Sequence, residues 1–469
     1  MAQNNYPAYL SYYAREFSGV SNTTFRIPPR ASGSLSARGQ MSFCLPTNCL
    51  VSCKDIRLVF SASTENANAA SKAARLPKAS SLIERVEVTA GGISVDAGIH
   101  NQNALEQALD NVKVLKHDAV DSHSEIYRNV SGVSLQKFGG NDGAAGNTIV
   151  EAYDTDNNAT QFSVDLGTFF RTVSPNMLDL SLLPEIVVTI HLTGNNIITS
   201  GANATPSGFV TKEDAAQQST FTVSNYSLLC PCYSLDDGMY QKVIAARMND
   251  AGYLTCTFKG YEAFSDTFNG VTRAATAASS LDKIICCFRP SGYDAISGAK
   301  RIVGTQTRSA DYPDHQDNVL QQIDCAGEEY LPAPMNFAAP MIAYTDAAGL
   351  KAEPELQFSI NSVAYPQFNP KLSQWYTMTK DAFEVPTTQS KSYQEWLQNR
   401  CVLAVRLNLP GSTLLRAKSG LDTRGSNSSL MLQCVNQQGN LATNSNVLLF
   451  LESTREMRLG VGKTLQIVL

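Results

Sequence analysis

Charged side chains are scarce in this chain of 469 residues. Lys, Arg, Asp and Glu together make up 17% of it, and the formal net charge is -5. This balance argues against a protein whose whole surface binds nucleic acid. No apolar run reaches the roughly 18 residues that a membrane-spanning helix needs. Residues 1–17 also lack the apolar stretch of a signal peptide, so we expect synthesis in the cytosol.

The usual sequence marks of catalysis and metal binding are missing too. The five histidines form neither a zincin pair nor a Cys/His finger, and there is no G-x-S-x-G elbow. Gly460–Thr464 reads GVGKT, but Met457 stands where a phosphate loop needs glycine, so a hairpin turn is expected. Asp154, Asp156 and Asn158 have calcium-loop spacing without the loop's glycine. We therefore expect no enzyme, no cofactor and no metal site.

Eleven cysteines are an odd number, which does not suit a complete set of internal disulfides. Cys286 and Cys287 are adjacent, so on a strand they would point to opposite faces. Cys44, Cys49 and Cys53 lie in or beside strand-like segments. In a reducing compartment such thiols stay reduced and serve as small apolar side chains.

The dominant pattern in the sequence is alternation of apolar and polar residues with a period of two. In Glu185–Leu192 the apolar residues Ile186, Val188 and Ile190 share one face, which is typical of a strand. Clusters of Gly, Asn, Asp, Ser and Pro separate such segments. Further strands are expected at Asp55–Phe60, Ser80–Thr89, Gln161–Phe170, Thr220–Leu229, Cys401–Leu409, Leu430–Val435, Val447–Leu451 and Leu465–Leu469.

Few segments have the spacing of a helix. We expect helices at Asn101–Lys116 and Asp237–Met248, and a short one behind a capping box that begins at Ser392. A helix followed by a run of strands occurs in each half of the chain. We therefore predict an all-β protein of two consecutive eight-stranded antiparallel sandwiches. The expected division is an N-terminal arm at 1–20, a first sandwich at 21–235 and a second at 236–469.

Several segments, spread over both halves, resemble a known family in their order and spacing. They are Phe25–Pro28, Gln40–Leu45, the long strand Cys49–Ser61, Ser80–Val88, Phe162–Leu192 and Ser419–Arg424. This order is similar to that of the double jelly-roll major capsid proteins of double-stranded DNA viruses. That lineage includes polinton-like viruses, virophages, giant viruses and adenovirus-type shells. The resemblance implies that both sandwiches are jelly rolls.

The resemblance also implies a structural role in the virion. Such proteins form homotrimers that look hexagonal and tile an icosahedral shell, often over an internal membrane. The implied partners are the chain itself, neighbouring capsomers, and minor capsid and penton proteins, with no sequence-specific nucleic acid. Assembly would take place in the cytoplasm or nucleus of the host cell.

An aromatic N-terminal segment fits this picture as an inward anchor. Tyr6, Tyr9, Tyr12 and Tyr13 precede Arg15, and such amphipathic side chains suit a membrane surface or a neighbouring subunit. The simpler interpretation is a solvated tail.

Two other classes share the physics of a β-sandwich. A carbohydrate-binding or adhesive protein should show clustered aromatic residues on one loop face, but the chain has only two tryptophans, Trp375 and Trp396. A glycoside hydrolase would need a pair of carboxylates in a cleft, and no pair stands out in the sequence. The capsid role is the expectation that the next sections test.

Overall fold

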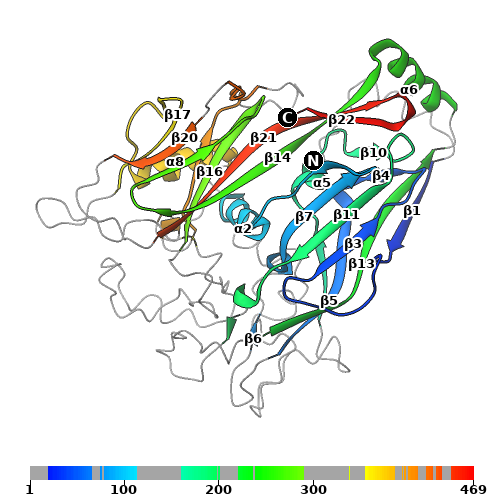
Figure 1. Ribbon diagram of the computed structural model, residues 1–469, viewed down its shortest axis with the longest axis horizontal. Coiled ribbons are helices and arrows are strands. Elements are labelled where there is room, and N and C mark those ends of the chain that lie inside the picture. The colour runs from blue at the N-terminus through cyan, green and yellow to red at the C-terminus, as the bar shows by residue number, and fades with distance from the viewer. Residues whose placement is uncertain are drawn as a thin grey trace, which may run out of the picture.

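The computed structural model shows two antiparallel β-sandwiches that lie side by side along the longest axis of the molecule (Figure 1). The described residues are 20–65, 74–75, 79–113, 160–197, 199–200, 220–235, 238–289, 337, 354–385, 393, 396–397, 400–409, 419–425, 429–435 and 445–468. Every ladder between described strands is antiparallel. The predicted all-β class with few short helices is confirmed.

The first sandwich is made from strands in residues 20–235. They are β1 (Val20–Ile27), β2 (Leu35–Ser36), β3 (Gln40–Cys44), β4 (Leu50–Ser52), β5 (Arg57–Glu65), β7 (Ile83–Ala90), β8 (Ile93–Asp96), β9 (Thr160–Asp165), β10 (Met177–Asp179), β11 (Ile186–Leu192) and β13 (Thr220–Leu235). One sheet has the order β10-β4-β13-β5-β9, with β1 and β2 also on β13, and the facing sheet is β3-β11-β7-β8. Two short strands, β6 (Ala74–Arg75) and β12 (Thr199–Ser200), pair separately.

The second sandwich is made from strands in residues 253–468. They are β14 (Tyr253–Phe268), β15 (Val271–Ala275), β16 (Leu281–Arg289), β17 (Leu356–Ile360), β18 (Val363–Tyr365), β19 (Val402–Arg406), β20 (Ser429–Cys434), β21 (Ser445–Gly460) and β22 (Thr464–Val468). One sheet has the order β14-β21-β16-β19 with β22 on β21, and the facing sheet is β15-β20-β17-β18. When short or flanking strands such as β2 and β22 are included, each sandwich has more than the eight strands that we expected.

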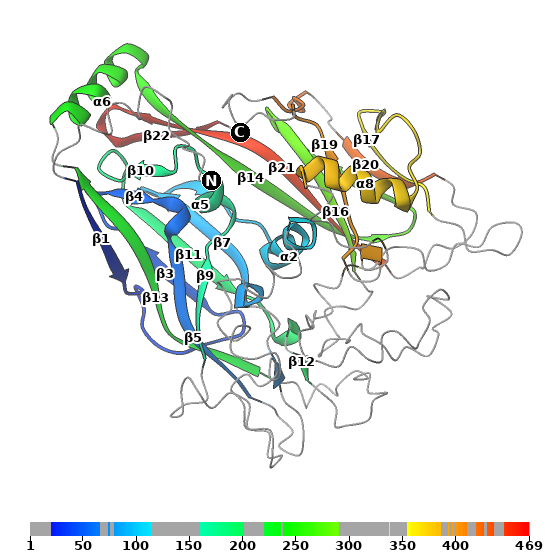
Figure 2. The same ribbon diagram turned by 180° about the vertical axis from the view of Figure 1, so that it is seen from behind.

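Four helices complete the described fold: α2 (Gln102–Lys113), α5 (Thr168–Thr172), α6 (Gly238–Ala251) and α8 (Leu372–Phe383). The structure confirms the helix expected at Asn101–Lys116, which ends in the described residues at Lys113, and the helix expected from Asp237. Figure 2 shows α2 between the two sandwiches, whereas α6 projects at one end of the molecule. Most of the capping box at Ser392 lies outside the described residues.

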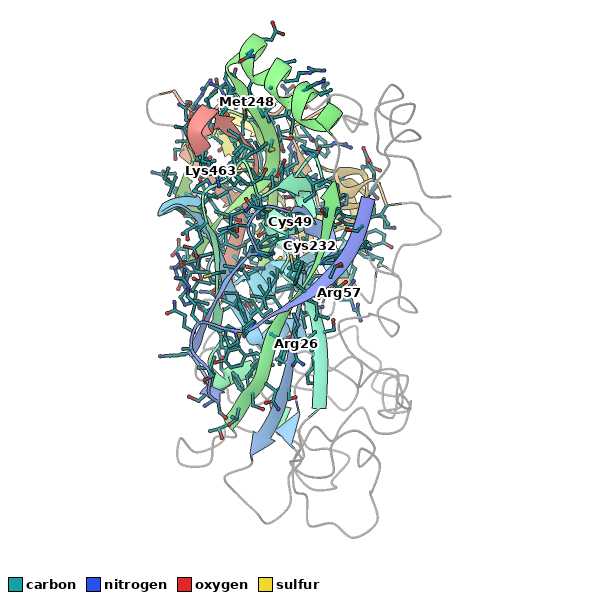
Figure 3. The ribbon with its side chains drawn as sticks, turned by 90° about the vertical axis from the view of Figure 1, so that its right-hand side faces the viewer. Arg26, Cys49, Arg57, Cys232, Met248 and Lys463 are labelled. Atoms are coloured by element: carbon teal, nitrogen blue, oxygen red, sulfur yellow. The ribbon has the colours of Figure 1, made fainter. Side chains whose placement is uncertain are left out.

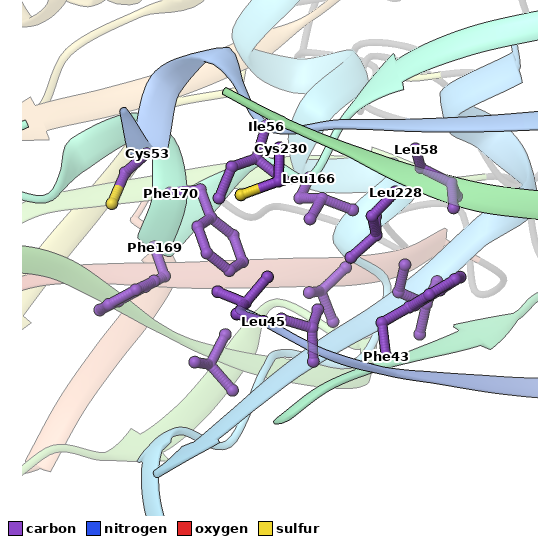
Figure 4. Packing of buried hydrophobic residues seen from close by; sticks show 14 of the residues in the cluster. Phe43, Leu45, Cys53, Ile56, Leu58, Leu166, Phe169, Phe170, Leu228 and Cys230 are labelled. Atoms are coloured by element: carbon purple, nitrogen blue, oxygen red, sulfur yellow. The ribbon is translucent and has the colours of Figure 1, made fainter. Parts of the chain in front are cut away.

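Each sandwich encloses a core between its two sheets. In the first core, Phe43 from one sheet faces Leu58 and Leu228 from the other, and Phe169 and Phe170 close one end (Figure 4). The strand β11 shows how the sequence produces this core, because its residues alternate between buried and half-buried along their whole length. The second core is similarly closed by aromatic side chains, among which Phe358 and Trp375 meet edge to face at 5.4 Å.

The strands β14 and β21 pair over 16 residues each and belong to both cores. At one end, Phe268 and Leu449 lie in the second core. At the other end, Phe258 and Met457 pack into the first core. The sheet of the second sandwich therefore extends over the first. The domain boundary near residue 235 therefore remains a prediction.

Two strand predictions were wrong in part. The strand expected at Gln161–Phe170 ends at Asp165, and α5 follows it. Between them Gly167 has φ 76°, and a Cβ there would lie 2.5 Å from the Gln102 amide nitrogen. The close approach of α2 thus requires this glycine, whose backbone conformation ends the strand. The long strand expected at Cys49–Ser61 is interrupted by a 3-10 turn at Cys53–Asp55.

Candidate functional surfaces

The N-terminal anchor predicted from Tyr6, Tyr9, Tyr12, Tyr13 and Arg15 lies outside the described residues. The described chain starts with β1, in which Val20 pairs with Leu235 at the end of β13. Because α6 begins three residues after Leu235, the described chain starts close to this helix. The anchor role stays a prediction.

A third apolar cluster joins the two sandwiches. Leu105 and Ala108 of α2 pack with Val402 and Leu448, which lie on the outer face of the β14-β21-β16-β19 sheet. The helix α8 contributes Ala382 to the same cluster. This face of the second sandwich is thus covered by helices from both halves of the chain. Such a packed joint fixes one sandwich on the other.

Beside this cluster, the carboxylate of Glu452 is buried and bonded on both oxygens. Tyr261 Oη donates a hydrogen bond to Glu452 Oε2 at 2.7 Å, and Lys283 Nζ donates to Oε1 at 3.0 Å. Burial opposes ionisation, but the ammonium groups of Lys283 and Lys259 outweigh it and lower the pKa of Glu452. Burial, reinforced by the Glu452 charge, raises the pKa of Tyr261 well above its usual value.

Two more buried carboxylates are also paired with cations. Asp282 accepts hydrogen bonds from Lys259 Nζ and from Ser280 Oγ at 2.9 Å. Glu106 of α2 accepts a hydrogen bond from Arg171 Nη1 at 2.8 Å. Burial raises the pKa of Glu106, and the Arg171 charge opposes that shift. These groups neutralise one another inside the protein, which is the arrangement of a structural network rather than of an acid and a base facing a substrate.

The cysteines are free thiols wherever the structure describes them, and most are buried. The prediction for Cys286 and Cys287 is confirmed, because the first lies in the second core and the other in the cluster between the sandwiches. Burial raises the pKa of Cys49 to about 12 and that of Cys232 to about 11; the two residues lie close together in Figure 3. Thiols with such values are poor nucleophiles at neutral pH.

The Gly460–Thr464 segment forms the predicted hairpin turn between β21 and β22. Gly462 has φ 75° and Lys463 has φ 61°, and the strand β22 follows instead of a helix. Because a strand and not a helix begins at Thr464, the turn lacks the helix N-terminus that binds phosphate in a phosphate loop. Within the described ranges, no group of three or more metal-ligating side chains comes together. The calcium-like triad Asp154, Asp156 and Asn158 lies outside those ranges.

Both tryptophans are internal. Trp375 is fully buried, and its indole nitrogen donates a hydrogen bond to the Leu356 carbonyl at 2.9 Å. Trp396 is also buried and packs on Tyr376 and Tyr393. Neither tryptophan ring is therefore free to stack on a sugar.

No protein-family model matches this chain, and no curated protein matches it by sequence. Solved structures do match. The crystal structure of VP54 of PBCV-1, fitted into a reconstruction of the virophage Sputnik, is 12% identical with a TM-score of 0.55, and 97% of each chain is covered. The present chain therefore has the double jelly-roll fold of viral major capsid proteins.

Two further matches also cover most of both chains. A structure from the Sputnik virophage is 11% identical with a TM-score of 0.51, covering 97% of this chain and 89% of that one. The major capsid protein of Faustovirus is 9% identical with a TM-score of 0.50, covering 94% and 90%. These double jelly-roll structures account for both sandwiches of the present chain in one alignment. The predicted resemblance is therefore confirmed at the level of the fold.

Proposed function

We propose that this protein is the major capsid protein of a double-stranded DNA virus. Its subunits would form homotrimeric, pseudo-hexagonal capsomers that tile an icosahedral shell. The observation that supports this most directly is the double jelly-roll fold over 97% of the chain, shared at full length with a capsid protein.

The physical properties of the chain suit such a shell. Two sandwiches held side by side by α2 and by the long strands β14 and β21 form a stiff block. Three such blocks around an axis place six sandwiches in a ring, which gives a hexagonal outline from a threefold assembly. Rigidity matters because every subunit of a shell must present the same contact surfaces to its neighbours.

The proposed partners follow from that role. They are other copies in the trimer, neighbouring capsomers, minor capsid and penton proteins, and in some shells a membrane beneath them. We propose no sequence-specific contact with nucleic acid, consistent with the net charge of -5. Among the described helices, none is both long and apolar enough to cross a bilayer. The protein would reside in the virion after assembly in the cytoplasm or nucleus of the host cell.

The mass and shape of the purified protein test this proposal. Light scattering after size-exclusion chromatography should give about 152 kDa, three times the subunit mass of 50.7 kDa. Negative-stain images of that peak should show hexagonal outlines. A stable monomer with no hexagonal particles would refute the capsid proposal. A sandwich that binds carbohydrate, the alternative from the sequence, gains no support from the buried Trp375 and Trp396.

A further inference from the structure

The two outer faces of the second sandwich differ in what covers them. The β14-β21-β16-β19 sheet has α2 and α8 packed on its outer face, in the cluster that includes Leu105 and Ala382. On the outer face of the β15-β20-β17-β18 sheet, large apolar side chains remain exposed to solvent, including Val271 and Phe368. One face is therefore closed within the subunit, and the other is available to a partner.

These exposed side chains form an apolar patch at one end of that sheet: Val271, Phe368, Met431 and Val435. Val271, Val435 and Phe368 are 47%, 41% and 50% exposed, and Met431 is half-buried. Hydrogen bonds hold the patch together. Cys434 N donates to the Gly270 carbonyl at 2.8 Å, which places Val435 beside Val271.

Glutamines link the other side of the patch. Gln433 Nε2 donates to Gln357 Oε1 at 3.3 Å, and Gln357 Nε2 donates to the Phe368 carbonyl at 3.3 Å. Because Gln433 pairs with Val271 across β20 and β15, Phe368 and Val271 lie on the same part of the sheet. Among the residues of strands β15, β17, β18 and β20, the one charged side chain is that of Arg273. Arg273 is exposed and lies directly opposite Met431, so the patch combines apolar side chains with one cation, as protein interfaces commonly do.

The strand β1 offers a second uncovered surface, in the first sandwich. It pairs with β13 along one edge, and all residues from Ser21 to Arg26 are exposed. Phe25 is 47% exposed. The single charge of the strand, Arg26, is turned back toward its own sheet, where its Nε donates to Ser227 Oγ at 3.0 Å. The strand thus lacks the lysines, prolines or bulges that usually protect an exposed edge from pairing.

Two other edge strands of the first sandwich, β3 and β8, are protected. The edge strand β3 is covered by the chain before it, because Arg30 N donates a hydrogen bond to the Ser42 carbonyl at 2.8 Å. The edge strand β8 ends in Asp96, a buried carboxylate that points inward. Inward charge and a covering segment are both known ways to prevent strand addition. Their absence at β1 marks this edge as a contact surface.

The β1 edge and the apolar patch lie at opposite ends of the molecule. Figures 1 and 2 both place β1 at one end of the longest axis and β17 and β20 at the other. Two different surfaces at opposite ends of one chain make a head-to-tail contact, which closes into a ring when the rotation suits. We propose that the β1 edge of one subunit, with Phe25 as its anchor, docks on the apolar patch of a second copy.

This inference rests on the proposed trimer and assigns its interface. Phe25 is the large apolar side chain exposed on β1, and a buried aromatic anchor is the usual centre of an interface.

Single substitutions at the two surfaces test the docking. We expect Phe25→Glu and Phe368→Glu each to raise the concentration of half-dissociation of the trimer at least tenfold in light scattering. Val243→Glu is the control, because Val243 is also exposed, at 56%, but belongs to α6 and not to β1 or the patch. It should leave the mass of the trimer unchanged. Near-UV circular dichroism of all three variants should match the wild type, since each site is on the surface.

A charge pair tests direct contact between the surfaces. In a head-to-tail ring, Phe25 of each copy meets Phe368 of the next, so Phe25→Glu combined with Phe368→Lys in one chain should restore trimers. Trimers that tolerate both single substitutions would overturn this interface while leaving the capsid role intact. If Phe25→Glu weakens the trimer and Phe368→Lys does not restore it, then β1 contacts something other than the patch, such as residues 1–19. A wild-type monomer would instead refute the proposed function itself.

Discussion

At the scale of single residues, Glu452 is the group whose loss should harm the fold most. Glu452→Gln keeps the size of the side chain but leaves Lys283 without its buried counter-charge. Removing one partner of a buried pair costs about 3 kcal/mol. We therefore expect a large fall in the midpoint of thermal unfolding. The matched control is Asp422→Asn, since the exposed pair of Asp422 with Arg424 should contribute little.

The same carboxylate predicts a dependence of stability on pH. Because the pKa of Glu452 is lowered from 4.5 in the folded state, its contribution is present above pH 4.5 and is lost as the pH falls through the folded pKa. The thermal midpoint of the wild type should therefore fall more steeply than that of Glu452→Gln in this acid range. Glu106, whose pKa is raised, contributes in the opposite direction, but equally in both proteins. Parallel curves would contradict the prediction.

Some residue properties could be predicted from the sequence and others could not. The turn at Gly460–Thr464 and the opposite faces of Cys286 and Cys287 are local, so the residue order determines them. The pair of Lys283 with Glu452 joins residues 169 positions apart, and no local pattern indicates it. The buried network was therefore missed.

At the scale of elements, alternation located the strands that have one buried face. β11 agrees with the prediction to within one residue, because its apolar residues alternate strictly. β14 was not predicted, and its residues Ser265, Asp266 and Thr267 are polar and exposed. α8 was also not predicted. Its buried residues Leu372, Trp375, Thr379 and Ala382 follow a helical period, but two of them are not strongly apolar.

The helix α2 gives a prediction at this scale. Leu105 is fully buried between the sandwiches, so Leu105→Ala should cost about 3 kcal/mol through lost contacts and a cavity. It should also loosen one sandwich from the other. Differential scanning calorimetry should then show a broadened or divided transition. Leu432→Ala, in the second core alone, should lower the midpoint similarly without dividing the transition. A single sharp transition in both variants would show that α2 does not couple the units.

At the scale of the whole molecule, the two units that the sequence indicated are not separate, because one core contains residues from both halves of the chain. Two helix-and-strand runs indicated two units, and the structure has two sandwiches. The first core, however, is completed by Cys256, Phe258, Met457 and Leu459 from the second half. No sequence pattern could show this, because long strands can pack either of their ends on either unit.

Residues 20–235 expressed alone should therefore fail to reach a native state. Without Phe258 and Met457 the first core would be open on one side, and its apolar residues would be exposed to water. We expect the fragment to bind a hydrophobic dye and to melt without a cooperative transition. Co-expression with residues 236–469 is the control, since it supplies the missing strands and should restore a soluble complex. A fragment that melts cooperatively alone would instead show that the first jelly roll is complete in itself. The shared strands β14 and β21 would then serve only to set the angle between the units.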